Sequence, residues 1–427
     1  MAIWIISLLA IFLFFTGTPI LLIIGSWVAA ASYFVVDYPV THIGIGATDT
    51  IKVYVFLAVP LFVATGDFLT AGGISQRLVA FSRSLVSIFP GSTAATTMVS
   101  CGLFASVSGS NSATAATMGR LLGPELKARG VSPGLAASLV AAGGTVGVII
   151  PPSVIFIVYG VTVNVSSVDL FLGGLIPGAL LVICLVASAI WLTRKVDPAE
   201  GLKSFKPVNI FKRAAEAWIG FIAIGVIFFG IYWGYFSPTE AAGVVTIYCF
   251  LAGWLITRRI RLRQLGSILL QSAALTGMIM PLVAFSVQFQ QVASVMGLQE
   301  VLQGFLQSVG TDIAPAFSVA LMMLLILMVG AITESIAVVL ILGPILAPVA
   351  AGFGIDPVHW GVIFVLGTTI GFVTPPYGLN LFVVSGVMEV PYAQVINNIF
   401  KLLIPLMVAW ILVAVMPWTT LLLQASG

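Results

Sequence analysis

The fold is decided by residues 106–160, SVSGSNSATAATMGRLLGPELKARGVSPGLAASLVAAGGTVGVIIPPSVIFIVYG. Two polar, glycine-rich segments, 106–112 and 143–153, interrupt otherwise apolar sequence. A second copy lies 224 residues further on, at 330–384, and aligns without a gap over residues 109–160. Glycines and prolines recur in register: Gly119, Pro124, Gly143, Gly147, Pro151 and Pro152 reappear as Gly343, Pro348, Gly367, Gly371, Pro375 and Pro376. Since both residue types interrupt helices, the chain holds an internal repeat that breaks its helices at matching points.

The composition is that of a membrane protein. Of the 427 residues, 60% are hydrophobic and only 7% are charged, whereas a soluble domain is about one quarter charged. Repeated apolar stretches near 20 residues long are typical of helices that span a lipid bilayer. The basic residues are too few and too dispersed for a nucleic-acid surface. The three cysteines and two histidines show no disulfide or metal-binding spacing.

The sequence predicts ten crossings, five in each half of the chain. They are residues 2–15, 18–36, 51–70, 132–164 and 169–193, and then 215–236, 238–258, 265–296, 356–388 and 395–424. Between the third and fourth crossing of each half lie an amphipathic stretch (74–90 and 298–310) and an apolar stretch with a polar middle (92–128 and 315–351). We expect scaffold helices in 1–50 and 215–264, a first repeat in 51–193, an interfacial connector at 194–214 and a second repeat in 265–427.

The stretches 92–128 and 315–351 do not cross the membrane in our interpretation. A single crossing would leave their polar middles in hydrocarbon, where irregular backbone survives only if protein or a water-filled cavity satisfies it. Each is therefore predicted to be a re-entrant hairpin, and 132–164 and 356–388 are predicted to be broken transmembrane helices. The expected fold class is an all-α polytopic membrane protein with an inverted repeat, as in elevator-type ion transporters.

Charge sets the predicted orientation. Five crossings per half is an odd number, so the two repeats should face in opposite directions. With the N-terminus outside, only Lys52 of the 17 lysines and arginines falls outside, which is a strong positive-inside bias. The first hairpin then enters from the cytoplasm and the second from the outer face.

The helix breaks are the candidate sites. An inverted repeat with broken helices is the usual architecture of a secondary transporter, whose site lies at the midplane. Unpaired carbonyls and hydroxyls there bind Na⁺, and positive helix N-termini attract a carboxylate. We expect two sodium sites flanking one substrate, with no organic cofactor and no metal other than Na⁺. The first is formed by Ser108, Ser110, Asn111, Gly143 and Thr145, and the second by Thr333, Glu334, Ser335, Thr369 and Gly371.

Some of these residues have a plainer explanation. Glycine and serine are common at helix contacts in membranes without any ligand, and we favour that reading for the packing of Ser112. Glu334 is an intramembrane acid, which by default suggests function, but it also stands where a helix dipole would stabilise it. Asn111 favours function because an amide inside a bilayer is costly without a partner.

At these segments the sequence resembles the large membrane (M) subunit of tripartite ATP-independent periplasmic (TRAP) transporters, of the DctM and SiaM type. The resemblance covers essentially the whole chain. It is carried by residues 108–113, Pro152-Ser153 with the following aromatic-rich helix, 170–178, 343–348 and 374–382. Many family members carry an acid after the first hairpin's serines, where this chain has Thr114 and Thr117.

The resemblance implies a sodium-coupled importer of carboxylated solutes that works by an elevator mechanism in the bacterial inner membrane. C4-dicarboxylates, sialic acid and other sugar acids are the expected substrates. The partners would be a periplasmic substrate-binding protein and a small membrane subunit encoded as a separate chain. The sodium sites of the family map onto Ser108, Ser110, Asn111 and Thr145 and onto Thr333, Ser335 and Thr369. The expected substrate contacts are Ser112, Ser153, Tyr377 and Asn380.

Other functional classes stay open at this point. A stand-alone sodium/carboxylate symporter of similar fold would need neither partner. A channel should show a continuous polar stripe along a pore, whereas this chain confines its polarity to two segments per half. An intramembrane enzyme has little support because the sequence offers no Ser/His/Asp or Cys/His arrangement. We therefore predict a transporter that is not an enzyme.

The predicted topology can be tested by labelling. Residues 194–213 and 258–263 should lie in the cytoplasm and residues 297–315 outside. A Lys203→Cys variant treated on intact cells with a membrane-impermeant thiol reagent should therefore stay unmodified. Modification of this position from outside would contradict the inverted arrangement of the two repeats.

Overall fold

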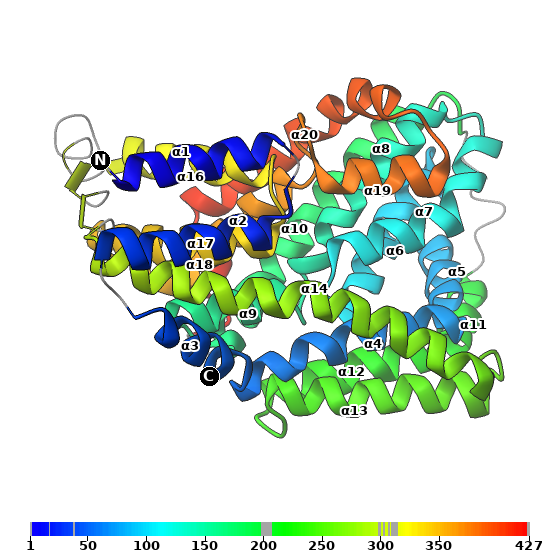
Figure 1. Cartoon of the computed structure of the whole chain (residues 1–427). Coiled ribbons are helices and arrows are strands. Elements are labelled where there is room, and N and C mark those ends of the chain that lie inside the picture. The colour runs from blue at the N-terminus through cyan, green and yellow to red at the C-terminus, as the bar shows by residue number, and fades with distance from the viewer. Residues whose placement is uncertain are drawn as a thin grey trace.

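The structure is a computed structural model that describes residues 2–16, 18–36, 39–197, 207–297, 300–301, 304–305, 308 and 315–424. Within these ranges every regular element is helical (Figure 1). In the first half they are α1 (Ala2–Phe15), α2 (Ile20–Ala31), η1 (Ser32–Val36), α3 (Val40–Ile51), η2 (Tyr54–Leu57), α4 (Ala58–Ala71), α5 (Ile74–Val86), α6 (Ser92–Ser108), α7 (Asn111–Ala128), α8 (Pro133–Gly144), η3 (Thr145–Val148), α9 (Val154–Val163) and α10 (Ser167–Thr193).

The second half continues the series. Its elements are α11 (Pro207–Glu216), α12 (Trp218–Tyr232), α13 (Pro238–Leu251), η4 (Ala252–Ile256), α14 (Leu262–Val295), α16 (Pro315–Gly330), α17 (Ser335–Gly352), α18 (Pro357–Gly371), α19 (Leu379–Met388), α20 (Tyr392–Val415) and α21 (Trp418–Leu421). Residues 198–206 of the expected connector, with the labelling position 203, and most of 298–314 lie outside the described residues.

Helix boundaries repeat with the same shift as the sequence. α7 runs from Asn111 to Ala128, and α17 occupies the corresponding positions, Ser335 to Gly352. The helix pairs α6–α7 and α16–α17 cover the segments 92–128 and 315–351, and their tips fall at Gly109–Ser110 and at 331–334. We call these pairs the first and second hairpins. The breaks at 145–153 and 372–378 separate α8 from α9 and α18 from α19.

One helix was not expected from the sequence. The sequence predicts no crossing between residues 36 and 51, but residues 40–51 form the helix α3. Moved on by 224 residues, α3, η2 and α4 together match α14, which runs unbroken for 34 residues. The first copy is interrupted where Val53 adopts an extended conformation. The two repeats therefore share this element but differ in its continuity.

The predicted ten crossings exceed what single helices supply. Six described helices are long and apolar enough to cross a membrane, or seven if the bent pair Ile210–Glu216 and Trp218–Tyr232 counts as one span. Two of the missing spans, 132–164 and 356–388, are each broken into two short helices, and the helices within 2–15 and 18–36 are also too short. One of the six long helices is α17, an arm of the expected second hairpin. This set of apolar helices is that of a polytopic membrane protein.

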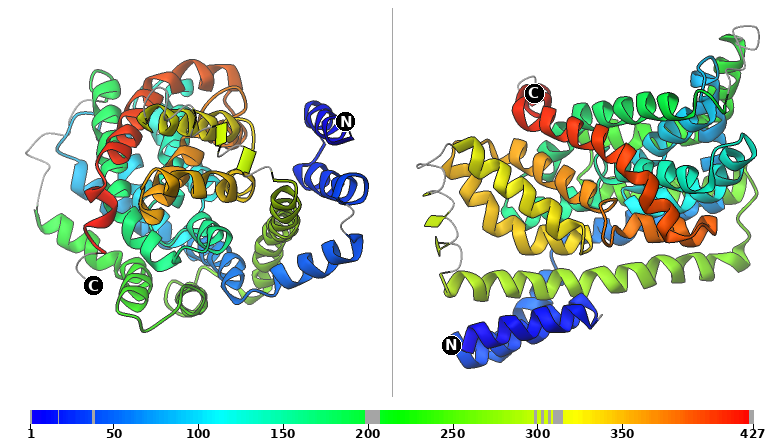
Figure 2. Two further views of the ribbon diagram at one scale, coloured as in Figure 1. Left: turned by 90° about the vertical axis from the view of Figure 1, so that its left-hand side faces the viewer. Right: turned by 90° about the horizontal axis from the view of Figure 1, so that it is seen from above.

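The helices next to the breaks form the centre of the molecule. Almost every residue of α8 and α18 is buried, as are most residues of α17. The long helix α14 lies between the N-terminal helices α1–α3 and the rest of the protein (Figure 2). On the other side of the molecule, α13 packs along α4. The breaks are thus shielded by other helices on several sides.

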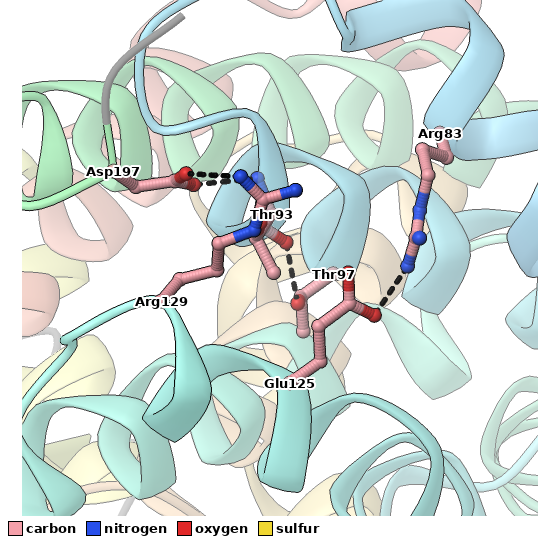
Figure 3. Close-up of polar contacts among 6 residues, drawn as sticks. All are labelled: Arg83, Thr93, Thr97, Glu125, Arg129 and Asp197. Atoms are coloured by element: carbon pink, nitrogen blue, oxygen red, sulfur yellow. Dashed lines mark hydrogen bonds and ion pairs between the residues drawn. The ribbon is translucent and has the colours of Figure 1, made fainter. Parts of the chain in front are cut away.

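The root of the first hairpin is fastened by one buried acid. Asp197, which follows α10, is fully buried, and its Oδ2 accepts a hydrogen bond from the Thr93 amide at 2.9 Å. Its backbone oxygen accepts the Gly91 amide at 2.7 Å, and Arg129 Nη1 lies 3.9 Å from Oδ1. Figure 3 shows the contacts of Asp197 with Thr93 and Arg129 beside the ion pair of Arg83 with Glu125. Asp197 therefore holds the start of α6 next to the end of α7.

Removing this carboxylate should loosen the hairpin root. Asp197→Ala leaves the Thr93 amide and the Arg129 side chain without this acceptor, and a buried group left unpaired costs about 1–3 kcal/mol. We expect a lower midpoint of thermal unfolding in detergent micelles. Asp49→Ala is the control because Asp49 is 64% exposed and pairs only with Lys52 within its own helix region. Equal midpoints for the two variants would contradict the proposed fastening.

Candidate functional site

The first hairpin tip lies directly on the break of its own repeat. Gly109 ends α6 with φ +60°, and Ser110 is the N-cap of α7. A Cβ on Gly147 would lie 2.5 Å from the Ser110 carbonyl oxygen, and one on Gly144 would lie 3.2 Å from that of Asn111. Only glycine permits this approach, because any side chain would collide with the tip backbone. The glycines of the break are therefore needed for contact with the hairpin.

The hydroxyls at this tip keep acceptor lone pairs that no described donor uses. Thr114 Oγ1 donates to the Ser110 carbonyl at 2.7 Å, so its single proton is used. The 3.2 Å contact between Ser108 and Thr114 then requires Ser108 to donate. The Ser108 oxygen keeps acceptor capacity, and so does Thr145 Oγ1, which donates to the Ala142 carbonyl at 2.6 Å. Such oxygens are suitable ligands for a cation.

Asn111 has a buried side-chain amide without hydrogen-bond partners in the described structure. Its side chain is only 3% exposed, and neither Oδ1 nor Nδ2 has a hydrogen-bond partner among the described residues. Leaving a buried amide unpaired costs about 1–3 kcal/mol, and native structures contain few such groups. A ligand bound at the tip would give these polar atoms a partner.

Asn380 brings the second repeat into the first site. Its side chain is fully buried, and Nδ2 donates to the Ala141 carbonyl of α8 at 3.4 Å. A Cβ on Gly144 would lie 2.8 Å from this nitrogen, so Gly144 stands between Asn380 and the backbone of Asn111. Asn380 Oδ1 has no partner in the described part of the chain. Asn380, which we expected to contact substrate, thus lies beside the predicted first sodium site.

The second tip repeats the arrangement with different residues. A Cβ on Gly371 would lie 2.6 Å from the Gly330 carbonyl carbon, and the Gly378 amide donates to the Ala331 carbonyl at 3.1 Å. Two hydroxyl oxygens, on Ser335 and Thr369, are fully buried and find no partner within the described ranges. The second site therefore also combines a close backbone contact with unsatisfied oxygens.

Three expected ligands of the sodium sites already have structural roles. Thr333 Oγ1 donates to the Val329 carbonyl at 2.9 Å, which leaves its lone pairs available. Glu334 is the N-cap of α17, and its Oε2 accepts the Ile336 amide at 3.1 Å. Gly143 packs on Cys101, whose Sγ would lie 2.6 Å from an added Cβ. The contribution of Gly143 to a site is thus limited to its backbone.

The remaining expected substrate contacts flank the two tips. An added Cβ on Gly109 would lie 2.8 Å from the Pro152 carbonyl oxygen, next to Ser153, and Gly378, next to Tyr377, bonds the second tip. Ser153 is buried and caps α9 by accepting the Phe156 amide at 3.1 Å. Tyr377 is 42% exposed, and its ring packs on Phe382 with centroids 4.9 Å apart. Ser112 is half-buried on α7. The contact between Gly66 of α4 and Ser108 was not predicted from the sequence; a Cβ added to Gly66 would lie 3.3 Å from the Ser108 Cβ.

The donor set indicates the kind of ligand. Within the described residues no group of three or more His, Cys, Asp or Glu side chains gathers that could hold a metal ion. The two tips instead offer hydroxyl, amide and backbone oxygens, with the Glu334 carboxylate at the second tip. Such oxygens suit a hard cation rather than a transition metal.

The contact between tip and break can be tested at one glycine. Gly147→Ala would force the Ser110 backbone to move, and overpacking of this kind costs about 1–3 kcal/mol. We expect reduced thermal stability in detergent. Gly277→Ala is the control, since an added Cβ there has nothing within 4 Å and alanine is the better helix former. The close contact would be refuted if Gly147→Ala were as stable as Gly277→Ala.

Comparison with known proteins fits this geometry. Residues 5–419 match the family "Tripartite ATP-independent periplasmic transporter, DctM component". The chain is 33% identical to the C4-dicarboxylate TRAP transporter large permease protein DctM of Pseudomonas aeruginosa, covering 90% of this chain and 89% of the relative. It is 34% identical to the sialic acid large permease protein SiaM of Vibrio cholerae, covering 87% and 86%.

A fused relative and a solved structure complete the comparison. The isethionate TRAP transporter permease protein DctMQ of Oleidesulfovibrio alaskensis is 33% identical over 93% of this chain, which spans only 62% of that relative's length. The fold resembles the YdaH transporter of Alcanivorax borkumensis, with a TM-score of 0.62, 15% identity and coverage of 90% and 88%. These relatives are permeases and not enzymes, and they are multi-pass proteins of the bacterial inner membrane. The chain belongs to the DctM component family of tripartite ATP-independent periplasmic transporters.

Proposed function

We propose that this large permease subunit imports carboxylated solutes in symport with Na⁺. The observation that carries the proposal is the unpaired, buried amide of Asn111 at the first tip, matched by the unpaired hydroxyls of Ser335 and Thr369 at the second. Buried polar groups without partners are costly, and both sets lie where a helix is broken. Two Na⁺ ions, one at each tip, would remove the cost.

The first ion would be held by oxygens of Ser108, Ser110, Asn111, Gly143 and Thr145. The second would be held by Thr333, Glu334, Ser335, Thr369 and Gly371. When bound, Na⁺ supplies the driving force of its gradient and compensates the charge of an acidic solute. The protein residues themselves keep each tip seated on its break, so that ion binding and hairpin position depend on each other.

An anionic solute suits the helix ends between the two sites. α7 and α17 both begin at a hairpin tip, so their N-terminal N–H groups converge on the centre of the molecule. α19 begins beside Asn380, whose amide offers further polar atoms there. Relatives are named for C4-dicarboxylate and for sialic acid. Dicarboxylates, sialic acid and other sugar acids are therefore the substrates to test.

The proposal includes partners and a moving part. A periplasmic binding protein would deliver the solute, and a small membrane subunit would act as a separate chain. The name DctMQ of the fused relative is consistent with a second membrane component. Both hairpins and both broken helices would move together as an elevator, because each tip is packed on its own break. α12 and α13 would belong to the stationary scaffold, with the two repeats inserted in opposite orientations.

Uptake in proteoliposomes tests the proposal. The large and small subunits are reconstituted together, the binding protein is kept saturating, and a panel of carboxylic acids is offered with an inward gradient of Na⁺ or of K⁺. We expect accumulation only with Na⁺. Equal uptake with the Na⁺ gradient and with the K⁺ gradient would refute the coupling. Sodium-driven uptake that needs neither partner would instead favour a stand-alone symporter.

Asn111 gives the sharpest prediction within this assay. Asn111→Ala removes one oxygen of the first site, so half-maximal uptake should require several-fold more external Na⁺. Asn397→Ala is the matched control, because Asn397 is an exposed asparagine on α20. The control should keep the normal sodium curve. If Asn111→Ala changes neither the sodium curve nor the maximum rate, Asn111 only caps or packs the tip.

A further inference from the structure

The two hairpins differ along one arm. α6 carries hydroxyls at seven positions, and at the corresponding positions of α16 there are none. Ser92, Thr93, Thr96, Thr97, Ser100, Ser106 and Ser108 are replaced by Ala316, Phe317, Ala320, Leu321, Leu324, Gly330 and Ile332. All seven hydroxyl residues of α6 are at most 4% exposed. Since the rest of the repeat aligns closely, the difference calls for a reason specific to the first hairpin.

Two of these hydroxyls are unusual for a buried helix. A serine or threonine inside a helix normally satisfies its hydroxyl on a carbonyl of the preceding turn. Thr97 does so at the Thr93 carbonyl, at 3.0 Å, and Ser106 at the Leu103 carbonyl, at 2.8 Å. Thr96 Oγ1 and Ser100 Oγ, both fully buried, have no partner anywhere in the described structure. They lie one helical turn apart and therefore share a face of α6.

This face of α6 differs from the two faces that meet α8 and α10. Cys101 lies against Gly143 of α8, and Gly102 lies against Val182 of α10. Thr96 and Ser100 occupy neither of these faces. α6 also packs on α4, α5 and α12. α5 contributes two more buried atoms, Ser75 Oγ and Gln76 Oε1, that have no hydrogen-bond partner among the described residues.

We propose that the α6 face defined by Thr96 and Ser100 is a water-lined release path to the cytoplasm. When the first hairpin separates from α4, α5 and α12, water would enter along this face and satisfy the hydroxyls that are unpaired in the packed state. Na⁺ and the acidic solute would leave the first site by this route. The apolar α16 offers no such surface, so the path belongs to one hairpin. The inference rests on the proposed transport function.

Cysteine accessibility tests the path directly. Single cysteines are placed at Thr96 and Ser100, and as controls at Ala320 and Leu324, in a protein whose native cysteines are replaced by alanine. A charged, membrane-impermeant methanethiosulfonate is applied to the cytoplasmic face of inside-out vesicles during sodium-driven turnover. We expect modification of the two α6 positions at least tenfold faster than that of the α16 positions. Equal rates at all four would overturn the proposal.

A pair of neighbouring threonines supplies the functional test. Thr96→Val removes an unpaired hydroxyl, whereas Thr97→Val removes one that is already bonded within the helix. Thr96→Val should lower the maximum uptake rate several-fold without changing the sodium concentration at half-maximal uptake, and Thr96→Ser should restore the rate. Thr97→Val should behave like the parent.

The outcomes separate this inference from the function on which it rests. Equal effects of Thr96→Val and Thr97→Val, with sodium-dependent uptake intact in the parent, would overturn the release path alone. Loss of sodium dependence in the parent protein would overturn the proposed function. If Thr96→Val does not fold, the labelling rates at positions 96 and 100 still decide the question.

Discussion

The structure depends on the rule that a helix broken inside a membrane must have its polar groups satisfied by neighbouring protein or a bound ligand. Each break here meets the tip of a hairpin from the same repeat, at contacts so close that Gly147 and Gly371 cannot carry a side chain. The glycines therefore do more than interrupt helices. They allow backbone to approach backbone, which concentrates carbonyls, amides and hydroxyls in two small volumes.

These volumes are not equivalent, although the sequence repeat makes them look so. The first tip has an amide, Asn111, where the second has the hydroxyl of Ser335. Asn380 of the second repeat donates to α8 of the first. The matching position of the first copy is Phe156, whose side chain cannot make such a bond. The hairpin arms differ as well, with hydroxyls on α6 and apolar side chains on α16. The two copies of the repeat therefore carry different polar groups at their tips and along their hairpin arms.

Much of this arrangement could be predicted from the sequence. The positions of the tips and breaks follow from glycines and prolines that recur at a fixed spacing. The directions of individual side chains cannot be predicted in this way. Ser153 caps α9, and Tyr377 lies partly exposed, although both were expected to contact substrate. The sequence predicts no span over α3 because its mixed sequence, VTHIGIGATDTI, has no long apolar run. Contacts such as Gly66 with Ser108 join distant residues, and no local pattern predicts them.

The central claim is that the tips and breaks together bind Na⁺. A ligand that binds only the folded protein stabilises it in proportion to the logarithm of its concentration above the dissociation constant. The direct measurement is therefore the thermal unfolding midpoint of the purified protein, titrated with NaCl and, at equal ionic strength, with KCl or choline chloride. We predict a saturable rise in the midpoint that only Na⁺ produces, and that is weakened when Asn111 or Thr369 loses its side-chain oxygen. The same midpoint in all three salts would contradict the account.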